Sequence, residues 1–595
     1  MFSCQDFLKN QISLDKTVEF GMIRTIPKIM AHNFINFLKN LSLVLLSSLL
    51  LILSFPRFDL GIFAWFGLLP LFIAIHGKRL GPSFFWSLIC GIFFFWGIFR
   101  WIVGVPKEMF LHHTFVLIYL GSFFGFFGLA FNFIRSRSGM TTAFFAAPFI
   151  WVSLEYVRSN LSFLALPWGL LAHSQYQYAS VIQIASLTGT YGISFLIVMV
   201  NAALAALIYS SLSDPHPIPP PSKGEEEGEG PPPKGKGEKE GLLPRGEVER
   251  KLTSSENSLP GGKGKIAFVI SSGTLLLFSL IYGEIVTSKP ITGNSIKISV
   301  IQGNIEQEKK WDPRYAQEIM DTYASLTRQA SKDKPVIIIW PETATPGSIS
   351  LDLSLNKKVR NLAREAGTYL LVGSAQDQKF LGKESVELKF LNSAYLIPPN
   401  PEATRNQQYD KIRLFPFGEY LPYKKLPWSL IGISGPGNYL PGKEYTVFEL
   451  PASRFGVTIC WENIFPDLFR RFVRDGAQFM INIINEAHFG KTAAPYQFLS
   501  ISVFRAVENG VFVVRCANTG VSCIIDPYGR ILDRVKGNNG EDIFVRGVMT
   551  RWIIPLDSKT IYTKYGDWFV WLAIVGSLLF LGISVFGKKA RYTPT

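Results

Sequence analysis

Three side chains of different chemistry follow or border strand-like runs in the second half of this chain. Glu342 lies in PETATPG after the apolar run VIIIW, Lys411 lies in DKIRLFPFGEYLP, and Cys460 lies in GVTICWEN. A carboxylate, an ammonium group and a thiol can serve as general base, oxyanion partner and nucleophile. The three runs therefore predict a site for nucleophilic catalysis.

Each of these residues also has a simpler interpretation. Cys460 could be a small hydrophobe buried at a strand end, Glu342 a surface acid, and Lys411 a lysine whose stem covers apolar surface. The number of histidines limits the choice of general base, because His488 is the only histidine in residues 286–563. Schemes that pair serine or cysteine with histidine then have a single candidate base, so a carboxylate base is the more economical choice.

The segment around Cys460 predicts how its thiol is presented. The buried run FGVTI precedes it, and an amphipathic helix follows with Leu468, Phe472 and Val473 available for its packed side. A turn from a strand into a helix exposes the residue at the turn, which here is Cys460. The backbone N–H groups of the next turn favour a thiolate there and can bind an oxyanion.

Residues 286–563 have the pattern of a layered α/β domain. Strand-like runs such as PVIIIWPE, FGVTIC and FMINIIN are continuous and apolar, which indicates burial on both faces of a sheet. Such sheets need covering layers. The helical stretches that alternate with them lie near 313–331, 353–366, 464–475 and 495–509.

The rest of the chain has the composition of a membrane protein. The 595 residues are 48% hydrophobic and 14% aromatic, with a mean hydropathy of +0.21. A bilayer core takes roughly 20 apolar residues as helix. The sequence predicts a polytopic α-helical bundle of about eight spans, of which the first, second and fifth are short or weak and could be re-entrant. Six lie within 39–210: 39–55, 58–76, 82–103, 112–134, 142–157 and 188–210, followed by 264–285 and 566–587.

Lysine and arginine in the short connections predict the orientation. The basic runs GKRLG, RSRSG and GKKAR fall on one side, which is cytoplasmic by the positive-inside rule. The N-terminal extension 1–38 and the linker 211–263 share that side, and 286–563 lies outside the cytoplasm. The linker is rich in Pro, Gly, Glu and Lys, and we expect it to be disordered.

The net charge of +15 does not indicate nucleic-acid binding, because the basic residues flank the spans or are scattered through the outer domain. Attraction to anionic lipid headgroups is the better account. The five cysteines are too scattered for a disulfide framework or a zinc site, although Cys516 and Cys523 could pair across an NTG turn. The sequence predicts no metal site and no cofactor.

The three runs resemble, in order and context, the Glu-Lys-Cys signature of the nitrilase superfamily. VIQGNIEQEKKWDP, PFGEYLP, NIINEAHFG and VVRCANTGVSCIIDPYGRI, with the membrane stretches LPWGLLAHSQ and IQIASLTGTYGISFLIVMVNAAL, resemble the bacterial apolipoprotein N-acyltransferase family. The resemblance spans nearly all of 40–587. It implies a nitrilase-like α-β-β-α sandwich for 286–563, placed on the periplasmic side of the bacterial inner membrane, with both termini in the cytoplasm.

The resemblance also implies acyl transfer in two steps. Cys460 would take the sn-1 acyl chain of a membrane phospholipid as a thioester, and pass it to the α-amino group of the N-terminal diacylglyceryl-cysteine of an apolipoprotein. Glu342 would move the protons, while Lys411 and the Trp461 backbone N–H would hold the oxyanion. The residues expected to orient Lys411 or line the site are Glu419 and Glu462.

Two further segments carry expectations. The run NIINEAHFG departs from the family's N-D-A-W-F-G pattern at Glu486 and His488, which leaves loop details and lipid preference open, and Asn485 and His488 are candidates for a substrate loop. Segment 420–442 combines large apolar residues with two lysines and predicts an arm among the lipid headgroups. It could instead fold onto its own domain. The apolar residues of the arm that we expect to contact lipid are Trp428 and Ile431.

Three functions are compatible with parts of this sequence. One is the acyltransferase, and another is a membrane-tethered amidase or nitrilase that uses water as acceptor and shares every triad residue. The third is a transporter or scaffold with an inactive outer domain, which the triad argues against. A hydrolase needs one anchor and has no use for eight spans and an apolar arm, so the sequence favours the acyltransferase.

Overall fold

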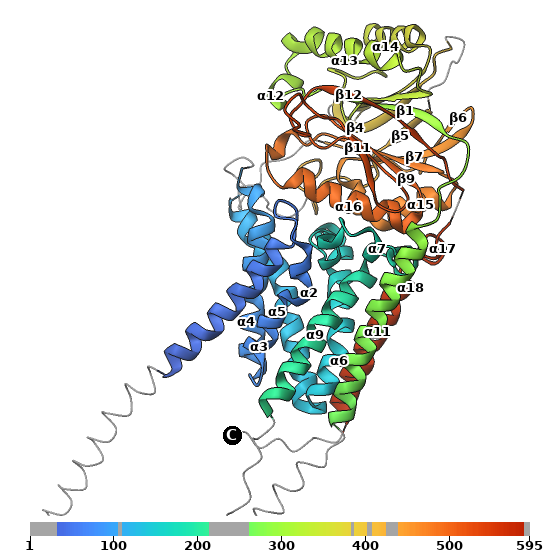
Figure 1. The fold of residues 1–595 in the computed structure, drawn as a ribbon. Coiled ribbons are helices and arrows are strands. Elements are labelled where there is room, and N and C mark those ends of the chain that lie inside the picture. The colour runs from blue at the N-terminus through green and yellow to red at the C-terminus, as the bar shows by residue number, and fades with distance from the viewer. Residues whose placement is uncertain are drawn as a thin grey trace, which may run out of the picture.

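The protein consists of a bundle of long helices and, at one end of it, a domain of two sheets between helical layers (Figure 1). The domain sits on the ends of the helices, so both parts contribute to the junction between them. The computed structural model describes residues 32–104, 110–213, 261–381, 386–400, 407–423, 438–557 and 559–587.

Among the described residues, seven helices are long and apolar enough to cross a membrane. The expected span 58–76 is instead a shorter apolar segment, Gly61–Ile75. Pro70 has no N–H to continue the helical ladder, and a helix from 61 to 75 reaches roughly 22 Å, less than a hydrocarbon core of about 30 Å. The shorter segment comprises η1 (Gly61–Phe63), α2 (Ala64–Gly67) and α3 (Leu69–Ile75), and the long helices are His32–Leu53, α4 (Leu80–Ile98), α5 (Phe110–Ser138), α6 (Met140–Asn160), α9 (Tyr191–Ser213), α11 (Gly261–Thr287) and α18 (Trp568–Phe586).

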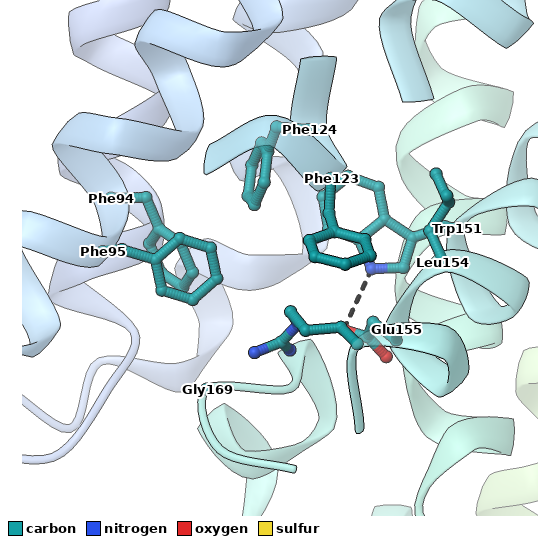
Figure 2. Close-up of a pocket in the computed structure, with 9 residues that line it drawn as sticks. Phe94, Phe95, Phe123, Phe124, Trp151, Leu154, Glu155 and Gly169 are labelled. Carbon is teal, nitrogen blue, oxygen red and sulfur yellow. Dashed lines mark hydrogen bonds between the residues drawn. The ribbon is translucent and has the colours of Figure 1, made fainter. Parts of the chain in front are cut away.

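Buried polar residues of α6 fix the segment that follows this helix. Glu155 accepts hydrogen bonds from Trp151 Nε1 and from the Leu171 N–H, both at 3.0 Å. Arg158 donates to the Trp168 carbonyl oxygen at 2.7 Å. These bonds hold residues 161–175 against the helix ends. The two side chains adjoin a small aromatic pocket (Figure 2), lined also by Phe94, Phe95, Phe123, Phe124, Trp151, Leu154 and Gly169.

The α/β domain contains two six-stranded sheets. In each sheet three neighbouring strands run parallel, β1-β2-β3 in the first and β7-β8-β9 in the second, and the other pairs are antiparallel. The first sheet has the order β12 (Gly547–Ile553), β1 (Ile296–Gln302), β2 (Ile337–Ile339), β3 (Tyr369–Leu381), β4 (Val386–Ile397) and β5 (Gln407–Asp410). The second has the order β11 (Ile531–Arg534), β10 (Cys523–Ile525), β9 (Phe512–Ala517), β8 (Phe479–Ile484), β7 (Ser453–Ile459) and β6 (Val447–Leu450).

The sheets pack face to face between two helical layers, which confirms the expected α-β-β-α sandwich (Figure 1). Between them, Cys516 Sγ donates to the carbonyl oxygens of Ile301 and Ile339, both at 3.3 Å. Cys516 and Cys523 are free thiols, so the pairing considered from the sequence is not formed. The outer layer is α13 (Ala316–Ser331) with α14 (Leu353–Ala366), and the layer next to the membrane helices is α15 (Pro466–Arg474) with α16 (Ala494–Asn509).

Helix α16 joins the domain to the bundle. Gln497 Oε1 accepts hydrogen bonds from the indole N–H groups of Trp101 and Trp168 at 3.1 and 3.0 Å. Near the other end of α16, Glu508 Oε1 accepts from the N–H and the hydroxyl of Thr190 at 2.9 and 2.5 Å. Breaking such bonds would leave buried polar groups without partners, which costs free energy. These bonds therefore hold the α/β domain firmly on the helix ends.

Candidate active site

Glu342 lies buried in the turn that follows β2. This turn packs closely on β3, since the Ala344 N–H donates to the Gly373 carbonyl oxygen at 2.8 Å. A Cβ atom at position 373 would lie 2.8 Å from both Glu342 Cα and Thr343 N. A glycine in β3 therefore allows the turn to approach the strand, and this approach sets the position of the Glu342 carboxylate.

Lys411 is the first residue after β5, and its side chain is buried. Its N–H donates to the Asn392 carbonyl oxygen of β4 at 2.8 Å. Its Nζ lies 2.8 Å from Glu419 Oε1 and 3.9 Å from Glu342 Oε1. Burial opposes the ammonium form, but the negative charges of Glu419 and Glu342 outweigh it and raise the pKa of Lys411. Lys411 is thus a fixed cation beside the Glu342 carboxylate.

Cys460 follows β7 and begins the short helix η8 (Cys460–Ile464), so the thiol lies at a strand-to-helix turn as expected. Its φ of +59° is a conformation that costs a non-glycine residue about 1–2 kcal/mol. Burial and the neighbouring Glu342 carboxylate raise the pKa of the thiol well above its usual value, while Lys411 lowers it. The thiol is therefore protonated at neutral pH, and it needs a base. Among the charged neighbours of the thiol, Glu342 has the largest effect on its pKa.

Asn392 of β4 belongs to this cluster, although the sequence did not single it out. Its Nδ2 donates to Glu342 Oε1 at 2.8 Å and lies 3.3 Å from Glu419 Oε1. The Phe415 N–H donates to the second oxygen of Glu419 at 2.7 Å. The Asn392 amide thus holds the carboxylates of Glu342 and Glu419 next to Lys411. The available signal was the polar pair Asn392 and Ser393 inside the otherwise apolar run FLNSAYLI.

Glu462 lies on η8 but connects the cysteine turn to the lysine segment. It is buried and accepts hydrogen bonds from the N–H groups of Ile412 at 2.7 Å, Arg413 at 2.9 Å and Ile459 at 2.8 Å. The Trp461 indole N–H donates to the Arg413 carbonyl oxygen at 2.6 Å. Glu462 therefore fixes backbone on both sides of the site rather than contacting Lys411 Nζ. Its burial raises its pKa to about 7.

The loop after β8 supplies another contact to the Glu342 carboxylate. The Asn485 N–H donates to Glu342 Oε2 at 2.8 Å. His488 lies two residues beyond Glu486 in η9 (Ala487–Phe489), and burial lowers its pKa. Glu486 is fully buried and pairs with Arg515 at 3.1 Å, so the carboxylate at this position neutralises a buried arginine. The two predicted arm residues, Trp428 and Ile431, lie outside the described part of the chain.

The structure thus gathers Glu342, Lys411 and Cys460 at the ends of strands from both sheets, with Glu419 beside them from the loop after β5. A base beside a protonated thiol and a fixed cation beside both can form a covalent intermediate and stabilise an oxyanion. In the part of the chain that the structure describes, no group of three or more His, Cys, Asp or Glu side chains could hold a metal ion.

Comparisons with known proteins account for both parts of the chain. Residues 47–203 match the Apolipoprotein N-acyltransferase N-terminal domain, and residues 297–549 match the carbon-nitrogen hydrolase family. A solved mutant of the Nesterenkonia AN1 amidase, from the nitrilase superfamily, is 19% identical with a TM-score of 0.34, covering 46% of this chain and 95% of that chain. An apolipoprotein N-acyltransferase of Chlorobaculum tepidum is 28% identical over 560 residues, or 88% of this chain and 92% of that protein. One of Geobacter metallireducens is 32% identical over 559 residues, or 92% of this chain and 96% of that protein. The chain belongs to the apolipoprotein N-acyltransferase family.

Proposed function

We propose that this protein moves the sn-1 acyl chain of a membrane phospholipid, through a thioester on Cys460, to the α-amino group of the N-terminal diacylglyceryl-cysteine of an apolipoprotein. The observation that carries the proposal is a cluster of buried Glu342 and Lys411 with a partly buried, protonated Cys460, in a domain bonded to the ends of membrane helices. The names of the relatives support apolipoprotein as acceptor.

In the first half-reaction Glu342 takes the proton of the Cys460 thiol, and the sulfur attacks the carbonyl carbon of the donor ester. The negative charge on the former carbonyl oxygen faces Lys411 Nζ and the Trp461 backbone N–H, in the first turn of η8, where N–H groups lack helical partners. The carbon–oxygen bond to the glycerol then breaks. Glu342 returns its proton to the leaving oxygen, which releases a lysophospholipid and leaves an acyl thioester.

In the second half-reaction the acceptor's α-ammonium loses a proton to Glu342. The free amine attacks the thioester carbon, and the oxyanion again faces Lys411. Collapse of the intermediate breaks the carbon–sulfur bond as the proton held by Glu342 passes to the Cys460 sulfur. The nitrogen then gives its remaining extra proton to Glu342, which releases it to water, and the amide is formed. Each positioned proton transfer contributes typically 10²–10⁴-fold to the rate, and a thiolate departs more readily than an alkoxide.

Donor and acceptor are both anchored in lipid, so the site needs access from the bilayer. Phe163 of η4 (Ser162–Leu164), in the loop after α6, contacts Tyr423 and Phe417 with ring centroids 5.3 and 6.3 Å apart. The described beginning of segment 420–442 thus rests against the bundle, which supports a lipid-facing arm there. The proposed arrangement places the α/β domain in the periplasm, at the outer face of the inner membrane, with both termini in the cytoplasm.

A transfer assay tests the proposal. Purified protein in vesicles of a defined diacyl phospholipid is incubated with a short lipopeptide that carries an N-terminal diacylglyceryl-cysteine. We expect the lipopeptide to gain the mass of one acyl chain, and a lipopeptide with a blocked α-amino group to remain unchanged. Release of free fatty acid without any acylated lipopeptide would show a hydrolase that uses water, and would contradict the proposal.

A further inference from the structure

A second lysine lies buried beside the general base. Lys310 ends the short helix α12 (Gln307–Lys310) within the charged run EQEKK, where an exposed position would be ordinary. It is only 4% exposed, and its Nζ donates to the Glu342 carbonyl oxygen at 2.9 Å. Its neighbour Lys309 is partly exposed and lies 3.7 Å from Glu306. Two adjacent lysines of one helix therefore have different environments.

The same helix holds the base from a second direction. Gln307 Oε1 accepts a hydrogen bond from Asn485 Nδ2 at 3.0 Å, and the Asn485 N–H donates to Glu342 Oε2 at 2.8 Å. Helix α12 thus contacts Glu342 at its main chain through Lys310 and at its carboxylate through Asn485. This arrangement makes the turn after β2 a fixed part of the site.

The charge of Lys310 also interacts with the ionisable groups of the site. Burial lowers the pKa of Lys310 to about 8, and the negative charge of Glu342, or of a Cys460 thiolate, opposes this shift. The titratable groups of the surrounding elements are Glu342 after β2, Cys460 on η8 and His488 on η9, and Lys411 lies at the Glu342 carboxylate. The charge of Lys310 therefore acts on both the Cys460 sulfur and the Glu342 carboxylate.

We propose that Lys310 is a positioning residue for the acyl transfer: its ammonium fixes the Glu342 turn and supplies a second positive charge that favours the Cys460 thiolate. This inference rests on the proposed function for its catalytic consequence, but its electrostatic consequence does not need a lipid substrate. The two consequences are measured separately. Alkylation of Cys460 reports the thiolate, and acylation of Cys460 reports the reaction.

The experiment compares wild type, Lys310→Met and Lys310→Gln with Lys309→Met as the matched control. The rate of Cys460 alkylation by iodoacetamide is followed by mass spectrometry of the Cys460 peptide across a pH series. We expect alkylation of Lys310→Met to be roughly tenfold slower than wild type below pH 8, because a nearby opposite charge shifts a pKa by about 1–3. The difference should shrink as the pH rises through about 8 and vanish about two units higher, where Lys310 itself has lost its charge. Lys309→Met should match wild type throughout.

Acylation by phospholipid in a single turnover gives the second readout. We expect a loss of roughly tenfold to a hundredfold in Lys310→Met, since a displacement of about 1 Å at a base costs on the order of 100-fold. Lys310→Gln should lose less, because its amide can still donate to the Glu342 carbonyl. If the Met variant does not fold, the Gln variant alone must show the slowed alkylation.

Several outcomes would overturn the inference. Alkylation profiles of the folded Lys310 variants that coincide with that of Lys309→Met would remove the charge effect, whatever happens to acylation. A slowed acylation with an unchanged alkylation profile would leave Lys310 as a structural residue only. A wild type that is never acylated would count against the proposed function, while the alkylation comparison would still decide the role of Lys310.

Discussion

Replacing Gly373 with alanine should disable the site without touching any reacting group. The added Cβ would lie 2.8 Å from Glu342 Cα and Thr343 N, and also against the Pro341 carbonyl oxygen. Ordinary contacts of this kind need about 3.4 Å or more, so the turn must move by roughly half an ångström or more away from β3. These are backbone atoms, and no side-chain rotation can relieve the overlap.

The displacement is expected to cost activity more than stability. Overpacking costs typically about 1–3 kcal/mol, whereas moving the base by up to about 1 Å reduces the rate on the order of 100-fold. Gly347→Ala is the matched control in the same loop, because its Cβ would meet only Leu355 Cδ2 at an ordinary 3.7 Å. The measurement is single-turnover acylation of Cys460 in folded protein, together with the melting temperature.

We expect Gly373→Ala to acylate Cys460 roughly 100-fold more slowly than wild type and Gly347→Ala to stay within about threefold of it. Equal rates for the two variants, with both proteins folded, would refute the claim that the close approach of the turn to β3 sets the position of Glu342.

Three further predictions concern the cation, the connecting carboxylate and the arm. Lys411→Arg should slow acylation by about 10²-fold or more, because a planar guanidinium cannot replace a compact buried ammonium; a mild loss would remove Lys411 from the oxyanion site. Burial raises the pKa of Glu462 from 4.5 to about 7, so the folded state binds this proton more tightly than the unfolded state. The free energy of unfolding therefore falls as the pH rises from about 4.5 to about 7, by roughly 3 kcal/mol at most. Glu462→Gln should flatten this decline in melts across pH, and an unchanged slope would contradict it. Replacing Trp428 and Ile431 together with Ser should impair acylation by phospholipid far more than by a water-soluble short-chain thioester, since each side chain forfeits about 1.5–3 kcal/mol of lipid burial; equal losses with both donors would place the arm in the domain core.

Local sequence patterns predicted the long helices and the two sheets well. Hydropathy located the seven long helices, and apolar strand runs located the sheets, because both depend on local composition. The span 58–76 is the exception: its hydropathy resembles that of its neighbours, but Pro70 and the short length of the Gly61–Ile75 segment limit what the helix can cross.

Contacts between distant residues are the part that sequence could not supply. Glu462 was expected to orient Lys411 or line the site, yet it binds the backbone of Ile412 and Arg413, some 50 positions away. Asn392 and Gly373 carry no motif, and their importance follows only from the packing of β4 and β3 on the base. Lys310 lies in a charged run that predicts exposure, and tertiary packing buries it.

The central claim is that Cys460 carries the acyl chain between donor and acceptor. The most direct test incubates the protein with a phospholipid of one defined acyl chain, without acceptor, and maps the cysteine peptides by mass spectrometry. We expect one added acyl mass on the Cys460 peptide, removed by neutral hydroxylamine and absent in Cys460→Ala, while the peptide of the buried Cys516 stays unmodified. An unmodified Cys460 in protein that still transfers acyl chains to a lipopeptide would contradict it.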